Sequence, residues 1–130
     1  MEFPEELRYT RDHEWISIDG DVATVGITDH AQHELGDVVF VELPAVGEKV
    51  ERSESLGVVE STKAVSDVFA PISGEVAEVN DGLPGSPELI NEDPYGDGWM
   101  VKIKLASPLD TSGLMTASEY RAFLDESAPG

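Results

Sequence analysis

The segment 56–69 constrains the fold of this chain more than any other part of the sequence. Two apolar runs, rich in β-branched residues, flank a short polar stretch that carries one lysine, Lys63. Such runs on both sides of a polar break predict a β-hairpin. Because the polar stretch lacks a tight-turn glycine, its backbone is not expected to cradle a phosphate. The outward-pointing amine of Lys63 is therefore the distinctive chemical group of this hairpin.

Further strands are expected on both sides of this hairpin. Residues 99–105 alternate, with apolar side chains at every second position and lysines between them, which is typical of a half-buried strand. Asp19 and Gly20 form a two-residue turn signal between two apolar runs. We expect strands over 15–18, 22–27, 38–43, 71–79 and 99–105.

Three short helices are expected among these strands. Thr28 and Asp29 are good N-cap residues for a helix that Gly36 can end. Ser86 is a candidate cap with Pro87 at the first helical position, for a helix over 86–90. Residues 116–119 form a capping box that opens a helix to about Asp125, and residues 127–130 are expected to fray. The chain is therefore predicted to be mostly β.

Size and charge exclude several classes of protein. The 130 residues suffice for one domain, which we place at 1–130. Eight basic and 27 acidic side chains give a net charge of −19, which repels nucleic acids and anionic lipids. Solubility in a salty interior and attraction of a basic partner explain this charge equally well. No membrane span, signal or transit pattern is visible, so we expect a cytoplasmic protein, mitochondrial only if a transit peptide has been removed.

Few residues other than Lys63 suggest chemistry. The chain has no cysteine, which excludes disulfides, thiolate zinc sites and thiol nucleophiles. His30 and His33, with Asp29 and Glu34, have a spacing common on solvated surfaces, so we expect no metal site. No catalytic constellation is recognisable, and we expect no catalytic residue. Lys63 alone fits a solvated turn residue, a biotin site or a lipoyl site.

Several ordered motifs resemble one family. Residues 59–67 followed by 70–76 resemble the attachment segment of lipoylated carrier proteins. Biotin carriers usually present Met-Lys-Met, whereas Thr62 and Ala64 flank the lysine here. The chain from about Leu7 to Leu124 resembles the H proteins of the glycine cleavage system. The stretches that carry this closer resemblance are 13–15, 25–32, 36–44, 91–95 and 97–99.

The resemblance implies a fold, a cofactor and partners. It implies a flattened β-barrel sandwich of two antiparallel sheets, of the lipoyl/biotinyl type, with short helices and a C-terminal helix. Lys63 would carry covalent lipoate and shuttle an aminomethyl group without catalysing its transfer. The implied partners are glycine decarboxylase, the tetrahydrofolate-dependent aminomethyltransferase, dihydrolipoyl dehydrogenase, and a lipoate ligase or a lipoyl or octanoyl transferase.

The resemblance also implies a resting place for the loaded arm. Glu14 and Asp67 would line a cleft whose carboxylates hold the cationic amine. Asp12 stands where many members have Ser, and Glu34 where some have His. Alternatives are a lipoyl donor in a relay, a lipoyl domain of a 2-oxoacid dehydrogenase complex, an unmodified acidic interaction domain and a free-standing enzyme.

Overall fold

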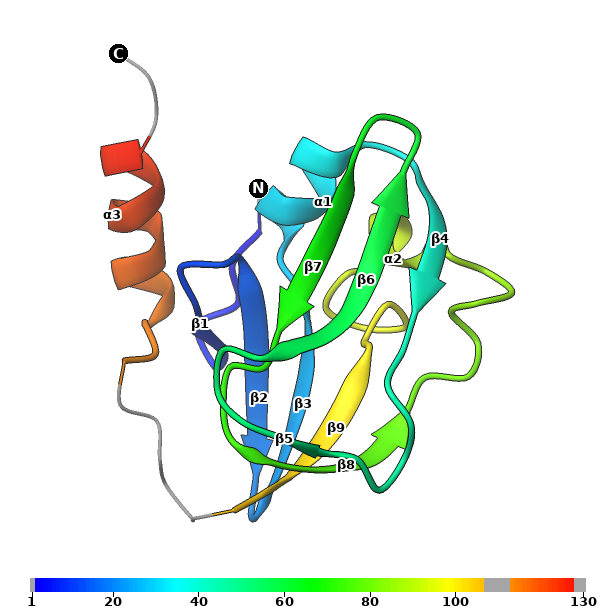
Figure 1. Ribbon diagram of the computed structural model, residues 1–130. Coiled ribbons are helices and arrows are strands. Elements are labelled where there is room, and N and C mark those ends of the chain that lie inside the picture. The colour runs from blue at the N-terminus through cyan, green and yellow to red at the C-terminus, as the bar shows by residue number, and fades with distance from the viewer. Residues whose placement is uncertain (1, 107–112, 128–130) are drawn as a thin grey trace.

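The computed structural model describes residues 2–106 and 113–127, which form two facing antiparallel sheets and three short helices (Figure 1). The larger sheet contains, in spatial order, β1 (Arg8–Tyr9), β2 (Glu14–Asp19), β3 (Val22–Ile27), β9 (Val101–Leu105), β8 (Gly74–Val79) and β5 (Lys49–Val50). The smaller sheet contains β4 (Val38–Glu42), β6 (Ser55–Ser61) and β7 (Val65–Phe69). The predicted two-sheet, mostly β architecture is confirmed.

The core lies between the two sheets because alternate residues of each strand are apolar. Ile16 and Val25 from the larger sheet and Val41, Val59 and Val68 from the smaller sheet belong to one buried cluster. In β9 the predicted alternation holds, since Val101 and Ile103 are buried and Lys104 is exposed. The β6–β7 hairpin therefore stands on a packed base and projects its loop at one end of the sandwich (Figure 1).

A second, aromatic cluster joins β1 and β2 to the C-terminal helix α3 (Ala117–Ser127). Trp15 points to the opposite side of β2 from Ile16 and packs in this cluster with Phe3, Leu7, Tyr9 and Tyr120. The Tyr9 and Tyr120 rings stack with centroids 4.9 Å apart. Helix α3 consequently stands beside β1, at the flank of the sandwich (Figure 1).

The helix signals predicted both ends of α1 and the capping box of α3 correctly, and both ends of α2 wrongly. Thr28 caps α1 (Asp29–Leu35), where its hydroxyl accepts from Ala31 N–H at 3.1 Å, and Gly36 ends it with φ +76°. Helix α2 spans Leu89–Glu92 rather than beginning at Ser86, because the residues before Leu89 form a turn and Glu88 makes no side-chain cap. Helix α3 extends two residues past Asp125, and of the tail predicted to fray, residues 128–130 lie outside the described part of the chain.

The hairpin turns show one shift in register. Asp19 pairs with Val22, so the two loop residues of the β2–β3 hairpin are Gly20 and Asp21 rather than Asp19 and Gly20. Gly20 adopts φ +64°, the left-handed conformation that such a loop requires. The two-residue strand β1 was not predicted. Its residue Tyr9 pairs with Trp15 and forms a β-bridge with Met115. No local sequence pattern predicts these contacts.

Candidate functional site

The β6–β7 hairpin ends in a two-residue loop of Thr62 and Lys63. Ser61 N–H donates to the Ala64 carbonyl at 2.8 Å, and Ala64 N–H donates to the Ser61 hydroxyl at 3.0 Å. A third bond, 3.1 Å from Thr62 N–H to the Asp37 carbonyl, ties the loop to the segment between α1 and β4. The backbone that carries Lys63 is thus fixed from two directions.

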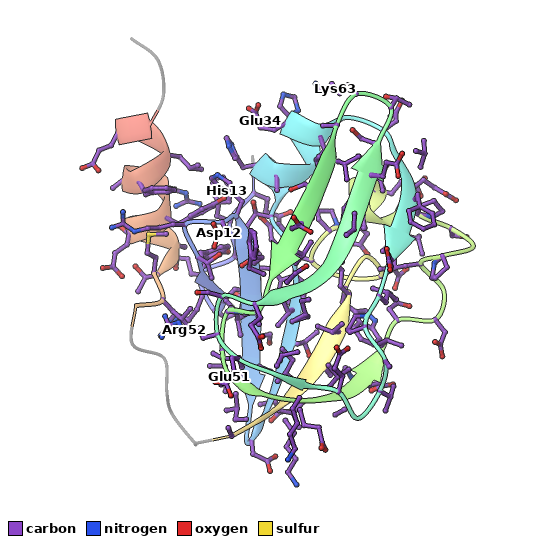
Figure 2. All side chains as sticks on the ribbon, viewed as in Figure 1. Asp12, His13, Glu34, Glu51, Arg52 and Lys63 are labelled. Atoms are coloured by element: carbon purple, nitrogen blue, oxygen red, sulfur yellow. The ribbon has the colours of Figure 1, made fainter. Side chains whose placement is uncertain are left out.

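The Lys63 side chain is exposed at this tip, as Figure 2 shows. Its stem passes the end of α1, where a methyl group added to Gly36 would lie 3.4 Å from Lys63 Cε. Among the described residues the one ion pair joins Lys102 to Glu78, so the Lys63 amine is held by no carboxylate there. An exposed, unpaired primary amine on a rigid base suits acylation.

A cleft of about 680 Å³ opens beside the hairpin, between β7, α1 and the turn that precedes β2. Ala64 and Val65 line it immediately after Lys63, and Asp67 lines it further along β7. The remaining lining residues are Asp12, His13, Glu14, Ile27, His30, Ala31, Glu34, Leu35, Val59, Ser66, Val68 and Leu124. In Figure 2, Glu34 lies near Lys63 at the hairpin end of the molecule, and His13 and Asp12 lie between α3 and the sheets.

Glu14 is the most deeply buried acid of the cleft, with 1% of its surface exposed. The Thr10 hydroxyl donates to its Oε1 at 2.9 Å, and Phe69 N–H donates to its Oε2 at 3.0 Å. Phe69 belongs to the smaller sheet, so this carboxyl group bridges the two sheets. The sequence alone gave no sign of this bridge, because residues 14 and 69 share no local pattern.

Opposing effects set the pKa of Glu14. Burial raises the pKa to about 7, while the hydrogen bonds from Phe69 and Thr10 act in the opposite direction. The Thr10 hydroxyl oxygen already accepts from Asp12 N–H and Glu14 N–H, both at 3.2 Å, so its own proton is directed at Glu14. The group is therefore poised between its neutral and ionised forms near pH 7, and a cation in the cleft would favour ionisation.

A chain of hydroxyl groups fixes His13, which adopts φ +66° and lines the same cleft. His13 Nδ1 lies 2.7 Å from the Tyr120 hydroxyl, which lies 2.9 Å from the Thr28 hydroxyl. Thr28 is fully buried, and its oxygen already accepts from Ala31 N–H. Within the described residues the Thr28 proton has the Tyr120 oxygen as its acceptor, so Tyr120 donates to His13 Nδ1. In neutral His13 the ring proton is therefore on Nε2.

The surroundings of His13 favour that neutral form. Burial lowers its pKa first, the neighbouring His30 ring with its centroid 4.8 Å away adds to this, and Asp12 and Glu34 oppose it. A proton on Nδ1 would also face the proton that Tyr120 directs there. The Tyr120 hydroxyl itself stays protonated near neutral pH, because burial raises its pKa to about 12. His13 is consequently a neutral side chain in a cleft otherwise rich in carboxylates.

The residues expected from the sequence gather here in unequal surroundings. Asp67 is exposed on β7, where it accepts from the Ser55 hydroxyl at 3.3 Å. Asp12 and Glu34 are also exposed and line the cleft, whereas Glu14 is buried in its wall. His13 and Tyr120 were not singled out as site residues, although His13 belongs to a quoted motif, and His30 was weighed only as a metal ligand. Within the described residues no three His, Asp or Glu side chains are grouped to hold a metal ion.

Among the described residues, no helix has the length and apolar character needed to cross a membrane. The longest helix, α3, has 11 residues.

Comparison with known proteins identifies one family over nearly the whole chain. The family described as glycine cleavage H-protein matches residues 7–127. The glycine cleavage system H protein of Anaeromyxobacter sp. (strain K) is 61% identical over 126 residues, which cover 97% of this chain and 98% of that protein. The protein of the same name from Rubrobacter xylanophilus is 58% identical over 125 residues, covering 96% and 97%.

A solved structure supports the same assignment. The crystal structure of a glycine cleavage system H protein from Mycobacterium marinum superposes with a TM-score of 0.88 and 45% sequence identity. The match covers 95% of this chain and 99% of that chain. The likeness therefore extends to the C-terminal helix and to both sheets.

Proposed function

The chain belongs to the glycine cleavage H-protein family, and from that premise we propose that Lys63 carries lipoate through an amide bond. The observation that carries the proposal is the exposed amine at the tip of a hairpin whose loop is fixed by four hydrogen bonds from Ser61, Thr62, Lys63 and Ala64 backbone N–H groups. A rigid base and a free amine are what a swinging arm requires.

As a member of this family, the chain is a carrier protein of the glycine cleavage system. We propose that it serves a pyridoxal-phosphate glycine decarboxylase, a tetrahydrofolate-dependent aminomethyltransferase and dihydrolipoyl dehydrogenase without catalysing a step itself. Attached lipoate would supply a disulfide that can be opened to carry the aminomethyl group of glycine on one of its sulfur atoms, and dihydrolipoyl dehydrogenase would reoxidise the dithiol left after transfer. A lipoate ligase, or a lipoyl or octanoyl transferase, would attach it. The bacterial relatives favour a cytoplasmic setting for this work.

The cleft beside the hairpin would hold the loaded arm. Its lining is apolar at Ile27, Val59 and Val65, which suits an aliphatic chain, and acidic at Glu14 and Asp67, which suits an amine. A cationic amine next to Glu14 would lower the raised pKa of that carboxyl group and so draw it into the ionised form. Glu14 thus accepts a hydrogen bond, and the cleft excludes water from the carbon that must not hydrolyse.

Intact-mass analysis tests the attachment directly. The chain is expressed with lipoate and a lipoate ligase, and we expect a mass increase of one lipoyl group. Lys63→Arg should abolish the increase, and the same substitution at Lys49, an exposed lysine on β5, should leave it unchanged. A wild-type chain that gains no mass under these conditions would refute the proposal. Glycine-dependent carbon dioxide exchange with the decarboxylase then separates the carrier role from a relay role.

A further inference from the structure

The side chain of Asn91, on α2, holds the segment that joins α1 to β4. Its Nδ2 donates to the Gly36 carbonyl at 2.8 Å, and its Oδ1 accepts from Val38 N–H at 2.9 Å. These two backbone groups lie on either side of Asp37, so one side chain fixes both neighbours of that residue. The second Nδ2 proton goes to Gln32 Oε1 at 3.0 Å, which uses both donors of the amide.

The partners of this amide fix its orientation. A carbonyl oxygen only accepts and a backbone N–H only donates, so a flipped Asn91 amide would set like groups against each other at Gly36 and Val38. Gln32 agrees with this orientation, because its Nε2 donates to Asp29 Oδ1 at 2.8 Å and its Oε1 is left to accept. An aspartate at position 91 could not replace the amide, because it lacks both donors.

The segment that Asn91 holds carries the acceptor of the hairpin tip. The Asp37 carbonyl accepts from Thr62 N–H at 3.1 Å, and Thr62 immediately precedes Lys63. Regular strand pairing does not set this contact, because the register of β4 against β6 shifts next to Val38. Asn91 supplies a constraint at this irregular start of β4. A line of hydrogen bonds therefore runs from α2 through Asp37 to the residue before Lys63.

A second asparagine makes the same kinds of bonds in a different place. Asn80 Nδ2 donates to the Asp97 and Trp99 carbonyls, both at 2.8 Å. Its Oδ1 accepts from Gly82 N–H at 3.2 Å. Asn80 is half-buried, as Asn91 is, and all of its partners lie outside the β6–β7 hairpin, α1 and β4. The two side chains therefore use their donors and acceptor alike but hold different segments.

From these contacts we propose that Asn91 is a positioning residue for the arm on Lys63. It holds the Asp37 carbonyl where Thr62 N–H reaches it, and so keeps Lys63 beside the cleft that shelters the loaded arm. Without this support the tip bond opens more often, and the aminomethyl group is exposed to water for longer. Water then supplies the oxygen of formaldehyde while the C–S and C–N bonds break, which leaves a thiol and ammonium. This inference rests on the proposed attachment of lipoate to Lys63.

The test compares Asn91→Asp with Asn80→Asp. Each substitution removes both donors, keeps an acceptor oxygen and adds one negative charge, so we expect similar losses of stability in urea unfolding. The first readout is the hydrogen-exchange rate of Thr62 N–H in the full-length, unlipoylated chains, measured by NMR. The second is formaldehyde release from the lipoylated chains after loading with glycine and the decarboxylase. If a carboxylate prevents folding, Asn91→Ser and Asn80→Ser form the pair, because serine has a shorter reach and adds no charge.

We expect Thr62 N–H to exchange roughly fivefold faster in Asn91→Asp than in wild type, the factor that one ordinary hydrogen bond contributes to an equilibrium. Formaldehyde release from this variant should rise by a similar factor. In Asn80→Asp both rates should stay at the wild-type value, although its stability falls as well. A role of Asn91 in stability alone would change both variants equally.

Three results would overturn the inference. Wild-type exchange of Thr62 in Asn91→Asp would show that the line of bonds does not hold the tip. Faster exchange with unchanged formaldehyde release would show that the tip bond does not shelter the arm. Equal increases in the two variants would attribute both rates to lost stability.

The wild-type chain separates this inference from the proposed attachment. If intact mass shows no lipoyl group on wild type, the attachment fails and the inference fails with it, whatever the exchange rate of Thr62. If wild type is lipoylated and any of the three results above is found, the inference fails and the attachment stands.

Discussion

The two sides of the cleft differ in how firmly their side chains are held. On the side of β2 and α3, the lining residue Glu14 is 1% exposed, and Tyr120, which bonds to the lining residue His13, is fully buried. Both have hydrogen-bond partners on other elements. On the side of β7, Lys63, Val65 and Asp67 are exposed. The same cavity thus joins a fixed wall to an open one.

This difference separates two tasks. The fixed wall holds groups whose protonation depends on their surroundings, such as Glu14 and His13, and burial gives them their shifted pKa values. In the proposed function, the open wall presents groups that other proteins would reach, and these exposed groups add little to the stability of the fold. Substitutions on the fixed wall should therefore cost stability, and substitutions on the open wall should cost function alone.

The largest expected contrast is between Tyr120→Ala and Lys63→Ala. Removing the buried ring deletes its stacking on Tyr9 and its two hydrogen bonds, so we expect unfolding free energy to fall by about 3–5 kcal/mol. Lys63→Ala removes an exposed side chain and should change it by less than about 0.5 kcal/mol. Urea unfolding followed by tryptophan fluorescence measures both. Equal losses in the two variants would contradict the division of the cleft into two walls.

The next effect is the pH dependence that Glu14 gives to stability. Its folded pKa, about 7, lies above its ordinary value of 4.5, so the folded state binds the extra proton between these values. Stability from this group is fully present below about pH 4.5 and declines as pH rises to about 7, by at most about 3 kcal/mol. Glu14→Gln should remove this decline. Urea unfolding of both chains from pH 4 to 8 gives the difference curve, and a flat curve would contradict the raised pKa.

A smaller effect concerns the proton on His13. Tyr120→Phe keeps the ring and removes the hydroxyl, which leaves the Thr28 proton without its acceptor, so we expect a loss of about 1–2 kcal/mol. Nitrogen NMR of the wild-type imidazole should show a bare Nδ1 and a protonated Nε2. In the variant that preference should weaken, because Nδ1 loses its donor. A protonated Nδ1 in the neutral wild-type ring would refute the assigned tautomer.

The smallest of the expected effects concerns Asp67. Asp67→Asn changes an exposed side chain with one 3.3 Å hydrogen bond, so stability should stay within about 0.5 kcal/mol of wild type. The loaded carrier should nevertheless lose its aminomethyl group a few times faster, since a charged acceptor becomes neutral. Release of formaldehyde measures this rate. Asp81→Asn, in an exposed turn after β8, is the matched control. An equal change in the rate of formaldehyde release in both variants would show that Asp67 does not protect the loaded arm.

Local patterns predicted the parts of the fold that local forces determine. The cap at Thr28, the end of α1 at Gly36 and the alternation of β9 each depend on neighbours within a few residues. Strand β1 was missed because its two residues are held by Trp15 and Met115 rather than by a repeating pattern. The start of α2 was misplaced because Ser86 and Pro87 form a turn before it.

The cleft was harder to predict because its parts meet across long separations. Glu14 and Asp67 came from family resemblance, and periodicity alone could not have placed two strands of different sheets around one cavity. The bond between His13 and Tyr120 spans 107 positions of the sequence. His13 also adopts a left-handed φ that a sequence normally signals with glycine. Only the packing of α3 against β1 reveals that pairing.

The bond from Thr62 N–H to the Asp37 carbonyl fastens the hairpin tip to the exit of α1, which is itself a wall of the cleft. This bond therefore couples the position of the hairpin tip to the position of that wall. The attachment point of an arm on Lys63 would then stay at a nearly constant distance from the mouth of the cleft. The return of the arm to the cleft would therefore depend on rotations about the bonds of the arm itself, and little on movement of Lys63.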